Sequence, residues 1–237
     1  MGRQLYELDK VSAIATDTLI ERVPNFRDAG VAGYLPVREA SGDGRPKDSF
    51  LVTFFTKDDP PLVAYEVRVE RDAPPEFAAF SPPKVGTESF VTLVRARQSA
   101  IAALPPVHQP INPILVPGGA NNDAGILVYL LAGTNKPGMA VFGQHFRVLM
   151  PEHGSVPKYV IPLSKSVLEV PINSGPNGTT SEALMVTHLV SDCPLETHVL
   201  VSLQTHLPIY VGTRVGIWRV DGDKIALIDD RPLTGAK

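Results

Sequence analysis

Charged side chains are nearly absent from one long stretch of this 237-residue chain. Between Gln98 and Met150, the charged residues are Asp123, Lys136 and Arg147 alone. A solvated protein surface carries a charged residue at about 25–35% of its positions. The stretch therefore cannot form an ordinary exposed face. Two alternatives remain: it forms central strands and a buried loop, or it forms a contact surface with another subunit or a protein partner.

Prolines restrict the first part of the same stretch. Residues 105–117 contain prolines at positions 105, 106, 110, 113 and 117. Proline lacks a backbone N–H and has a fixed φ angle, so this density excludes a helix and excludes pairing as a central strand. We expect an extended or edge conformation, either as a surface connection or as an arm that lies against a neighbouring subunit.

Short runs of β-forming residues make up much of the remaining chain. Residues 62–70 alternate cleanly, with Val63 and Val67 on one face and Glu66 and Arg68 on the other, as in a half-buried strand. Residues 198–207 also alternate, which predicts another strand. The predicted strands cover residues 50–56, 62–70, 126–132, 139–150, 159–162, 167–172, 184–190, 198–207, 211–220 and 224–228.

Two segments have helical periodicity instead. In residues 1–24, apolar positions recur at steps of three and four from Leu5 to Val23. Residues 87–104 keep the same spacing, and Thr87 is a suitable N-cap. We therefore predict a mainly β (α+β) fold, an antiparallel β-sandwich or partly closed barrel with two short flanking helices.

The pattern also predicts an organisation into domains. Residues 1–48 contain the first helix and a charged loop over residues 25–48, and residues 49–237 form a β-rich domain. Proline and glycine at residues 152–157 indicate a possible sub-boundary there.

Composition excludes several classes of protein. The 22 Lys and Arg residues against 25 Asp and Glu residues give a net charge of −3, so we expect no nucleic-acid partner. The single cysteine, Cys193, excludes a disulfide framework and a cysteine-based zinc site. No apolar run approaches the roughly 18 residues of a membrane span, and the N-terminus lacks the apolar segment of a secretory signal. We therefore expect no membrane association and a cytoplasmic location.

Motifs for nucleotide binding and hydrolysis are absent from the sequence. It contains no Gly-x-Gly-x-x-Gly fingerprint, no Walker-type lysine loop, no His-Glu-x-x-His and no Gly-x-Ser-x-Gly. We therefore expect no cofactor.

Histidines supply the one candidate site. On a strand, Glu196 and His198 would point to the same face, about 6.6 Å apart. His188 across a loop, or His145 from another strand, would complete three nitrogen or oxygen ligands of a metal site. The predicted metal ligands are therefore His145, His188, Glu196 and His198. The alternative is that these are ordinary hydrogen-bonded or surface residues.

Two functions are compatible with these observations. The first is a non-enzymatic structural protein that acts by self-assembly as a homo-oligomer, or by binding a protein partner, through residues 98–150. The second is a small-molecule pocket enzyme or metal-assisted hydrolase that uses the four residues above, with Arg147 steering an anion. We expect the first, because the sequence contains no convincing catalytic constellation.

Overall fold

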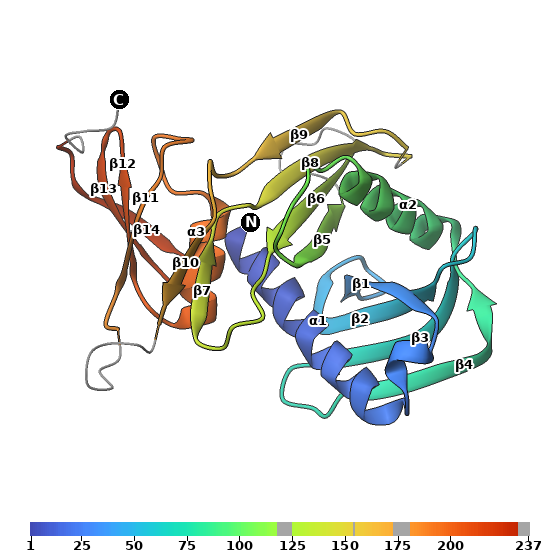
Figure 1. Ribbon diagram of the computed structural model, residues 1–237. Coiled ribbons are helices and arrows are strands. Elements are labelled where there is room, and N and C mark those ends of the chain that lie inside the picture. Colours follow the sequence, from blue (N-terminus) through green and yellow to red (C-terminus); the bar gives the residue numbers. More distant parts are fainter. Residues whose placement is uncertain (118–124, 154, 173–180, 232–237) are drawn as a thin grey trace.

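The computed structural model describes residues 1–117, 125–153, 155–172 and 181–231 (Figure 1). The fold is mainly β with three helices, which confirms the predicted α+β class but adds one helix to the predicted two. No sheet within these ranges closes into a barrel, so the arrangement is sandwich-like. Nor does any helix in them combine the length and the apolar composition that crossing a membrane requires.

The described part of the chain contains three α-helices and fourteen strands. The helices are α1 (Gly2–Arg22), α2 (Glu88–Ala102) and α3 (Glu196–Thr205). The strands are β1 (Val31–Ala40), β2 (Pro46–Thr56), β3 (Leu62–Glu70), β4 (Glu76–Val85), β5 (Ile111–Pro117), β6 (Gly125–Ala132), β7 (Met139–Phe142), β8 (Phe146–Pro151), β9 (Tyr159–Pro162), β10 (Leu168–Pro171), β11 (Leu184–Thr187), β12 (Ile209–Thr213), β13 (Gly216–Asp221) and β14 (Lys224–Asp229).

The first sheet is an antiparallel meander of β1, β2, β3 and β4 in chain order. The prediction of a charged loop over residues 25–48 is wrong, because β1 and the start of β2 occupy much of that segment. β1 lies at the edge of the sheet, where one side of the strand is unpaired. Pro36 is tolerated there because an edge strand can lack one N–H, and the side chain of Arg38 is exposed to solvent. An edge strand that contains proline and charged residues therefore has the same composition as a loop, and the sequence alone does not distinguish the two.

The second sheet, in the order β5-β6-β8-β9, explains the missing charges. Tyr129 and Leu131 of β6 pack in one core with α1, while Val128 and Leu130 pack in another with α2. Both faces of the sheet are thus covered within a single chain. Strands β6 and β8 of the charge-poor stretch are therefore core, and its proline-rich strand β5 takes the expected edge position. Residues 101–110 of the same stretch are mostly exposed, and residues 118–124 lie outside the described ranges, so contact of this stretch with a partner stays a prediction.

The predicted boundaries fall between or within paired strands. Residue 48 lies inside β2, which pairs with β1. Residues 152–157, of which residue 154 lies outside the described ranges, connect the neighbouring strands β8 and β9. The division into domains stays a prediction.

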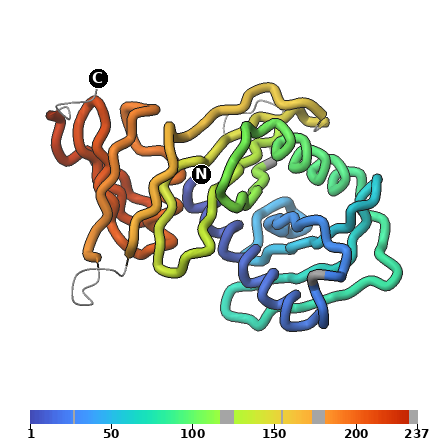
Figure 2. Tube along the Cα trace, viewed as in Figure 1, coloured from blue at the N-terminus to red at the C-terminus, as the bar shows by residue number. Residues whose placement is uncertain are grey.

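Helix α1 runs between the C-terminal part of the molecule and the first sheet (Figures 1 and 2). Its apolar stripe is at most 6% exposed and packs with β2, β3, β5, β6 and α3. At its start, a Cβ atom on Gly2 would come within 2.5 Å of the Cβ of Val199 in α3, so glycine permits this close approach of the two helices. The stripe consists of Leu5, Leu8, Val11, Ala15 and Leu19.

The third part contains the sheet β11-β12-β13-β14, the β7-β10 ribbon and α3 (Figure 1). The strand predicted over residues 198–207 is wrong, because α3 occupies Glu196–Thr205. β11 and β12 are parallel neighbours, and parallel strands need a crossover connection, which α3 provides. Residues 197–202 are all buried, so no polar face reveals the helical period in the sequence.

A sharp break separates β7 from β8, where the sequence predicts one strand over residues 139–150. Gly143 has φ +100°, and a Cβ atom there would lie 1.8 Å from the carbonyl oxygen of Ser166. The next residue, Gln144, also has a positive φ of 54°. The chain therefore leaves the β7-β10 ribbon at this point and enters the second sheet, with His145 placed directly after the turn.

We expect Gly143→Ala to lower the free energy of unfolding by about 2–5 kcal/mol, because it combines a strained φ with a backbone clash. Urea unfolding followed by circular dichroism measures the change. Gly42→Ala is the matched control, since no heavy atom lies within 4 Å of its added Cβ. Equal stability of the Gly143 and Gly42 variants would contradict the proposed role of the turn.

Candidate functional site

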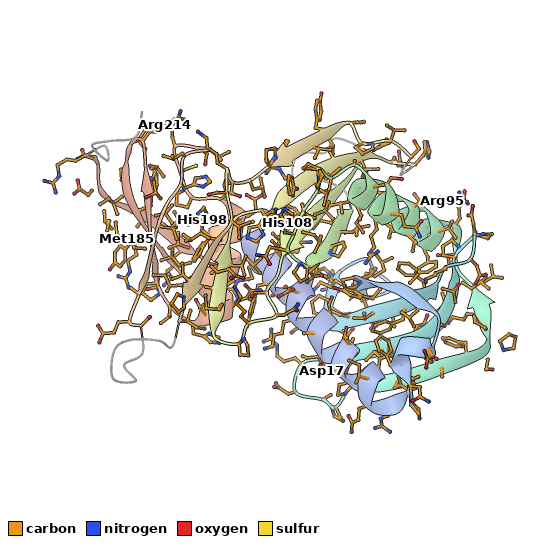
Figure 3. The ribbon with its side chains drawn as sticks, viewed as in Figure 1. Asp17, Arg95, His108, Met185, His198 and Arg214 are labelled. Atoms are coloured by element: carbon orange, nitrogen blue, oxygen red, sulfur yellow. The ribbon has the colours of Figure 1, made fainter. Side chains whose placement is uncertain are left out.

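Three of the predicted site residues, His145, His188 and His198, line one cavity of about 130 Å³. Figure 3 labels His198 on α3, and its ring lies 6.4 Å from that of Phe142 in β7. The rings of His188 and His198 meet edge to face with their centroids 4.8 Å apart. The fold therefore brings together histidines from three separate segments of the chain.

Each histidine is positioned by a different local structure. His145 follows the turn after β7, and His188 follows β11, where its N–H donates to the carbonyl of Gly212 at 2.8 Å. His198 occupies the first turn of α3, where its ring accepts the backbone N–H of the N-cap residue Leu195. This is the place that Glu or Gln takes in a capping box.

Backbone amides fix the tautomers of two of the rings. Nδ1 of His145 accepts the N–H of Ala132 at 3.0 Å, and Nδ1 of His198 accepts the N–H of Leu195 at 3.0 Å. A ring nitrogen that accepts a hydrogen bond carries no proton. The proton of each neutral ring therefore lies on Nε2.

Ser191 fixes the third ring in the same way. Its hydroxyl lies 2.9 Å from Nε2 of His188 and donates its one proton to the carbonyl of Cys193 at 2.6 Å. The hydroxyl oxygen must then accept from the ring, so His188 also carries its proton on Nε2.

Burial keeps these histidines uncharged. It lowers the pKa of His145 to about 4, and a weak backbone hydrogen bond to Val141 opposes the shift in part. Burial, followed by the proximity of His188, lowers the pKa of His198 to about 3. Burial also lowers the pKa of His188. All three rings are therefore neutral at pH 7.

One of these donors has no acceptor at normal hydrogen-bond geometry, although the Val141 backbone lies near the ring. Nε2 of His145 is buried and has no hydrogen-bond partner among the described residues. A buried polar group without a partner costs about 1–3 kcal/mol, so native structures keep few of them. An acceptor atom that reaches this N–H, which neighbouring groups bury in the present structure, would therefore be stabilising.

Glu196 does not join the histidines. Its Oε1 accepts from the hydroxyl of Tyr129 at 2.6 Å and from Nη1 of Arg147 at 3.0 Å. Glu196, a predicted metal ligand, and Arg147, the predicted anion-steering residue, are thus bonded to each other. The cause is the helix: residues two apart share a face on a strand, but point in different directions on a helix. Burial and Glu196 together raise the pKa of Tyr129.

The geometry gives no support to the predicted metal centre. Within the described ranges, no group of three or more His, Cys, Asp or Glu side chains is placed to hold a metal ion. A histidine that ligates a metal through Nε2 usually donates its Nδ1–H to a protein acceptor. His145 and His198 do the reverse, since their Nδ1 atoms accept from the backbone. The rings are arranged as hydrogen-bond donors.

The sequence analysis missed the polar loop that completes the cavity. Ser164, Lys165 and Ser166 line it, together with Thr187 and Thr197. Ser164 also accepts the backbone N–H of Gln144 at 2.7 Å, which ties this loop to the turn before His145. The run Ser-Lys-Ser between two predicted strands is the sequence signal that marks this loop.

A second cavity of about 370 Å³ also has His145 in its wall. Its polar residues are bonded to one another: Asp9 accepts from the side-chain amide of Asn112 and from Nε2 of Gln204, the latter at 2.7 Å. Burial raises the pKa of Asp9. These groups connect α1, β5 and α3, so they serve the structure rather than a ligand.

Comparison with protein-family models, with curated proteins and with solved structures yields no match to this chain.

We expect the free energy of unfolding to fall as the pH is lowered below about 6.5, the ordinary pKa of an unfolded-state histidine. There the unfolded chain takes up protons, while His145 and His198 in the folded chain do so only near pH 4 and pH 3. Each should contribute a loss of about 2 kcal/mol between pH 7 and pH 5. Urea unfolding at the two pH values measures the loss.

His145→Asn should remove the share of His145 in that loss, about 2 kcal/mol, because the asparagine oxygen can still accept the N–H of Ala132 but does not titrate. His153→Asn, at an exposed position, is the control and should keep the full pH dependence. An unchanged pH dependence in His145→Asn would show that His145 is not buried in its neutral form.

Proposed function

We propose that this chain binds a small molecule bearing an oxyanion, a carboxylate or a phosphate, in the histidine cavity. The observation that carries the proposal is the buried, unpartnered Nε2–H of His145, whose tautomer the backbone of Ala132 enforces. His198 is held in the same tautomer by Leu195. Two preorganised neutral donors in one cavity suit an oxygen acceptor of a ligand.

The charges around the cavity favour an anion. Lys165 lines it, whereas none of the described residues that do so is acidic. The hydroxyl groups of Ser164, Ser166, Thr187 and Thr197 add further donors. A volume of about 130 Å³ corresponds to roughly four water molecules, so the cavity accommodates a small group rather than a large cofactor.

The hydrogen bonds favour binding over hydrolysis. Ser191 and His188 lie at the distance of a nucleophile and its base, 2.9 Å. A general base must present a lone pair to the nucleophile, however, and Nε2 of His188 carries its proton while the Ser191 hydroxyl donates to Cys193. We therefore propose a non-enzymatic protein, as the sequence leads us to expect, but one that binds a small molecule in place of the expected assembly or protein partner. Contact of a protein partner with residues 98–150 stays a prediction, and burial within one chain accounts for the lack of charge in strands β6 and β8.

We expect saturable shifts of the imidazole nitrogen signals of His145 and His198 when sodium acetate or inorganic phosphate is titrated into the protein. Two-dimensional ¹H–¹⁵N spectroscopy of the imidazole rings measures the shifts and reports the Nε2–H tautomers directly. The two probes distinguish a carboxylate from a phosphate ligand, and sodium chloride at equal ionic strength is the control.

His145→Asn keeps the acceptor for Ala132 but loses the ring N–H, so it should weaken anion binding about tenfold or more. His153→Asn should bind as the unaltered chain does. Absence of saturable shifts with both anions, or equal binding by the His145 variant, would refute the proposed function.

A further inference from the structure

A cleft of about 490 Å³ lies between the first sheet and the start of α2. It is larger than either cavity described above and has the size of a small-molecule site. Apolar side chains form most of its wall, and two of them, Val37 and Val85, are 40% and 79% exposed. A molecule bound in the cleft would cover these exposed groups. The apolar wall consists of Leu35, Val37, Leu51, Val63, Val85, Phe90 and Leu93.

The pairing of the strands sets the floor of the cleft. Leu35 of β1 pairs with Thr53 of β2, and Thr53 pairs with Glu66 of β3. Cross-strand partners share a face of the sheet, so these three side chains lie side by side, and all three line the cleft. Val52 points to the opposite face, into the core with α1. The floor of the cleft therefore carries a hydroxyl and a carboxylate next to apolar groups.

The ring of Phe90 is held in place on the α2 side of the cleft. A Cβ atom on Gly86 would lie 2.2 Å from Cδ1 of Phe90, so glycine permits the chain to approach the ring this closely. Phe90 also meets Phe55 edge to face, with the ring centroids 6.2 Å apart. The protein itself thus fixes the aromatic part of the wall.

Two opposite charges stand next to each other in the cleft. Nζ of Lys84 in β4 lies 3.0 Å from Oε1 of Glu66, and the two side chains are 43% and 23% exposed. A partly exposed ion pair of this kind contributes little to stability, so it can open at little cost. Glu39, the other carboxylate in the wall, is instead held by two hydrogen bonds from Arg68 at 3.0 and 3.3 Å. Glu66 and Lys84 are therefore the charged groups that a ligand can engage.

The start of α2 adds a second position that favours negative charge. Thr87, the N-cap, and Ser89 both line the cleft. The hydroxyl of Thr87 accepts the N–H of Phe90 at 3.2 Å. The N–H groups of Glu88 and Ser89 precede it in the first turn, where the helix supplies no acceptor and its dipole attracts an anion. Lys84 and the helix start thus favour a carboxylate, beside a Glu66 that favours an ammonium group.

We propose that this cleft binds a free α-amino acid with an apolar side chain. Its ammonium group contacts Glu66, its carboxylate contacts Lys84 and the start of α2, and its side chain packs against Phe90 and the apolar wall. An α-amino acid carries its two charges on one carbon atom, and Glu66 and Lys84 are correspondingly adjacent. Binding replaces one ion pair within the protein by two ion pairs to the ligand. A residue inside a peptide carries neither charge and does not match the cleft.

This cleft is separate from the histidine cavity, since no residue lines both. The proposal therefore does not depend on the proposed function.

Isothermal titration calorimetry of the full chain at pH 7 tests the proposal with free L-phenylalanine and L-leucine, which should both bind saturably. Phenethylamine lacks the carboxylate of phenylalanine, and 3-phenylpropionate lacks the ammonium group. Each should bind at least about tenfold more weakly than phenylalanine, because one charged group of the cleft is left without its partner. Free glycine, which has no side chain to cover the apolar wall, should also bind more weakly.

Two substitutions separate the two charged contacts. Glu66→Gln should weaken the binding of phenylalanine and phenethylamine about tenfold, and should not weaken that of 3-phenylpropionate. Lys84→Gln should weaken phenylalanine and 3-phenylpropionate, and should not weaken phenethylamine. Glu70→Gln, at an exposed position of the same strand outside the cleft, is the matched control and should leave all affinities unchanged.

Opposite selectivity in the two variants cannot arise from a loss of folding, which would weaken both truncated ligands together. The proposal is overturned if neither amino acid binds saturably, or if a truncated ligand binds as tightly as phenylalanine. It is equally overturned if Glu66→Gln and Lys84→Gln fail to affect the two truncated ligands in opposite ways.

Discussion

The burial of one apolar stripe of α1 connects all parts of this fold. The helix fills the space between the first and second sheets, and its first turn lies against α3. The faces of the first and second sheets that contact α1 are covered by the helix, so each sheet depends on the helix for a closed core. A single 21-residue helix at the start of the chain thus sets the relative positions of elements that are formed much later in the sequence.

The regular elements with one polar and one apolar face were predictable from the sequence. α1 has a clean stripe, and α2 begins at Thr87, whose hydroxyl accepts the N–H of Phe90 at 3.2 Å. The turn between β13 and β14 lies at the predicted break between residues 220 and 224. The single strand predicted over residues 211–220 is wrong, because the chain turns at residues 214–215 and forms two antiparallel strands, β12 and β13. α3 was not predictable by this route, because six consecutive residues are buried and leave no period to detect. β1 was missed for the opposite reason, since an edge strand tolerates proline and charge.

The candidate site was likewise predictable in part from the sequence. Three histidines do meet, but for a reason other than the predicted spacing: α3 turns Glu196 away toward Tyr129 and Arg147. Residue types alone suggest metal ligands, whereas the hydrogen bonds to backbone amides decide which nitrogen holds the proton. For His145 that information belongs to the tertiary structure, because Ala132 lies on another strand. For His198 it follows from the helix start, because Leu195 is the N-cap of α3.

The break at Gly143 has a consequence for how such a chain could evolve. Consecutive strands on its two sides belong to different sheets, since β7 packs with the C-terminal core while β8 lies in the middle of the second sheet. The C-terminal sheet and α3 therefore cannot be transferred to another protein as a self-contained module, because part of their core, Ala140 and Phe142, is encoded more than forty residues upstream. Recombination at residues 152–157 would leave that core incomplete, so the two halves are constrained to be inherited together.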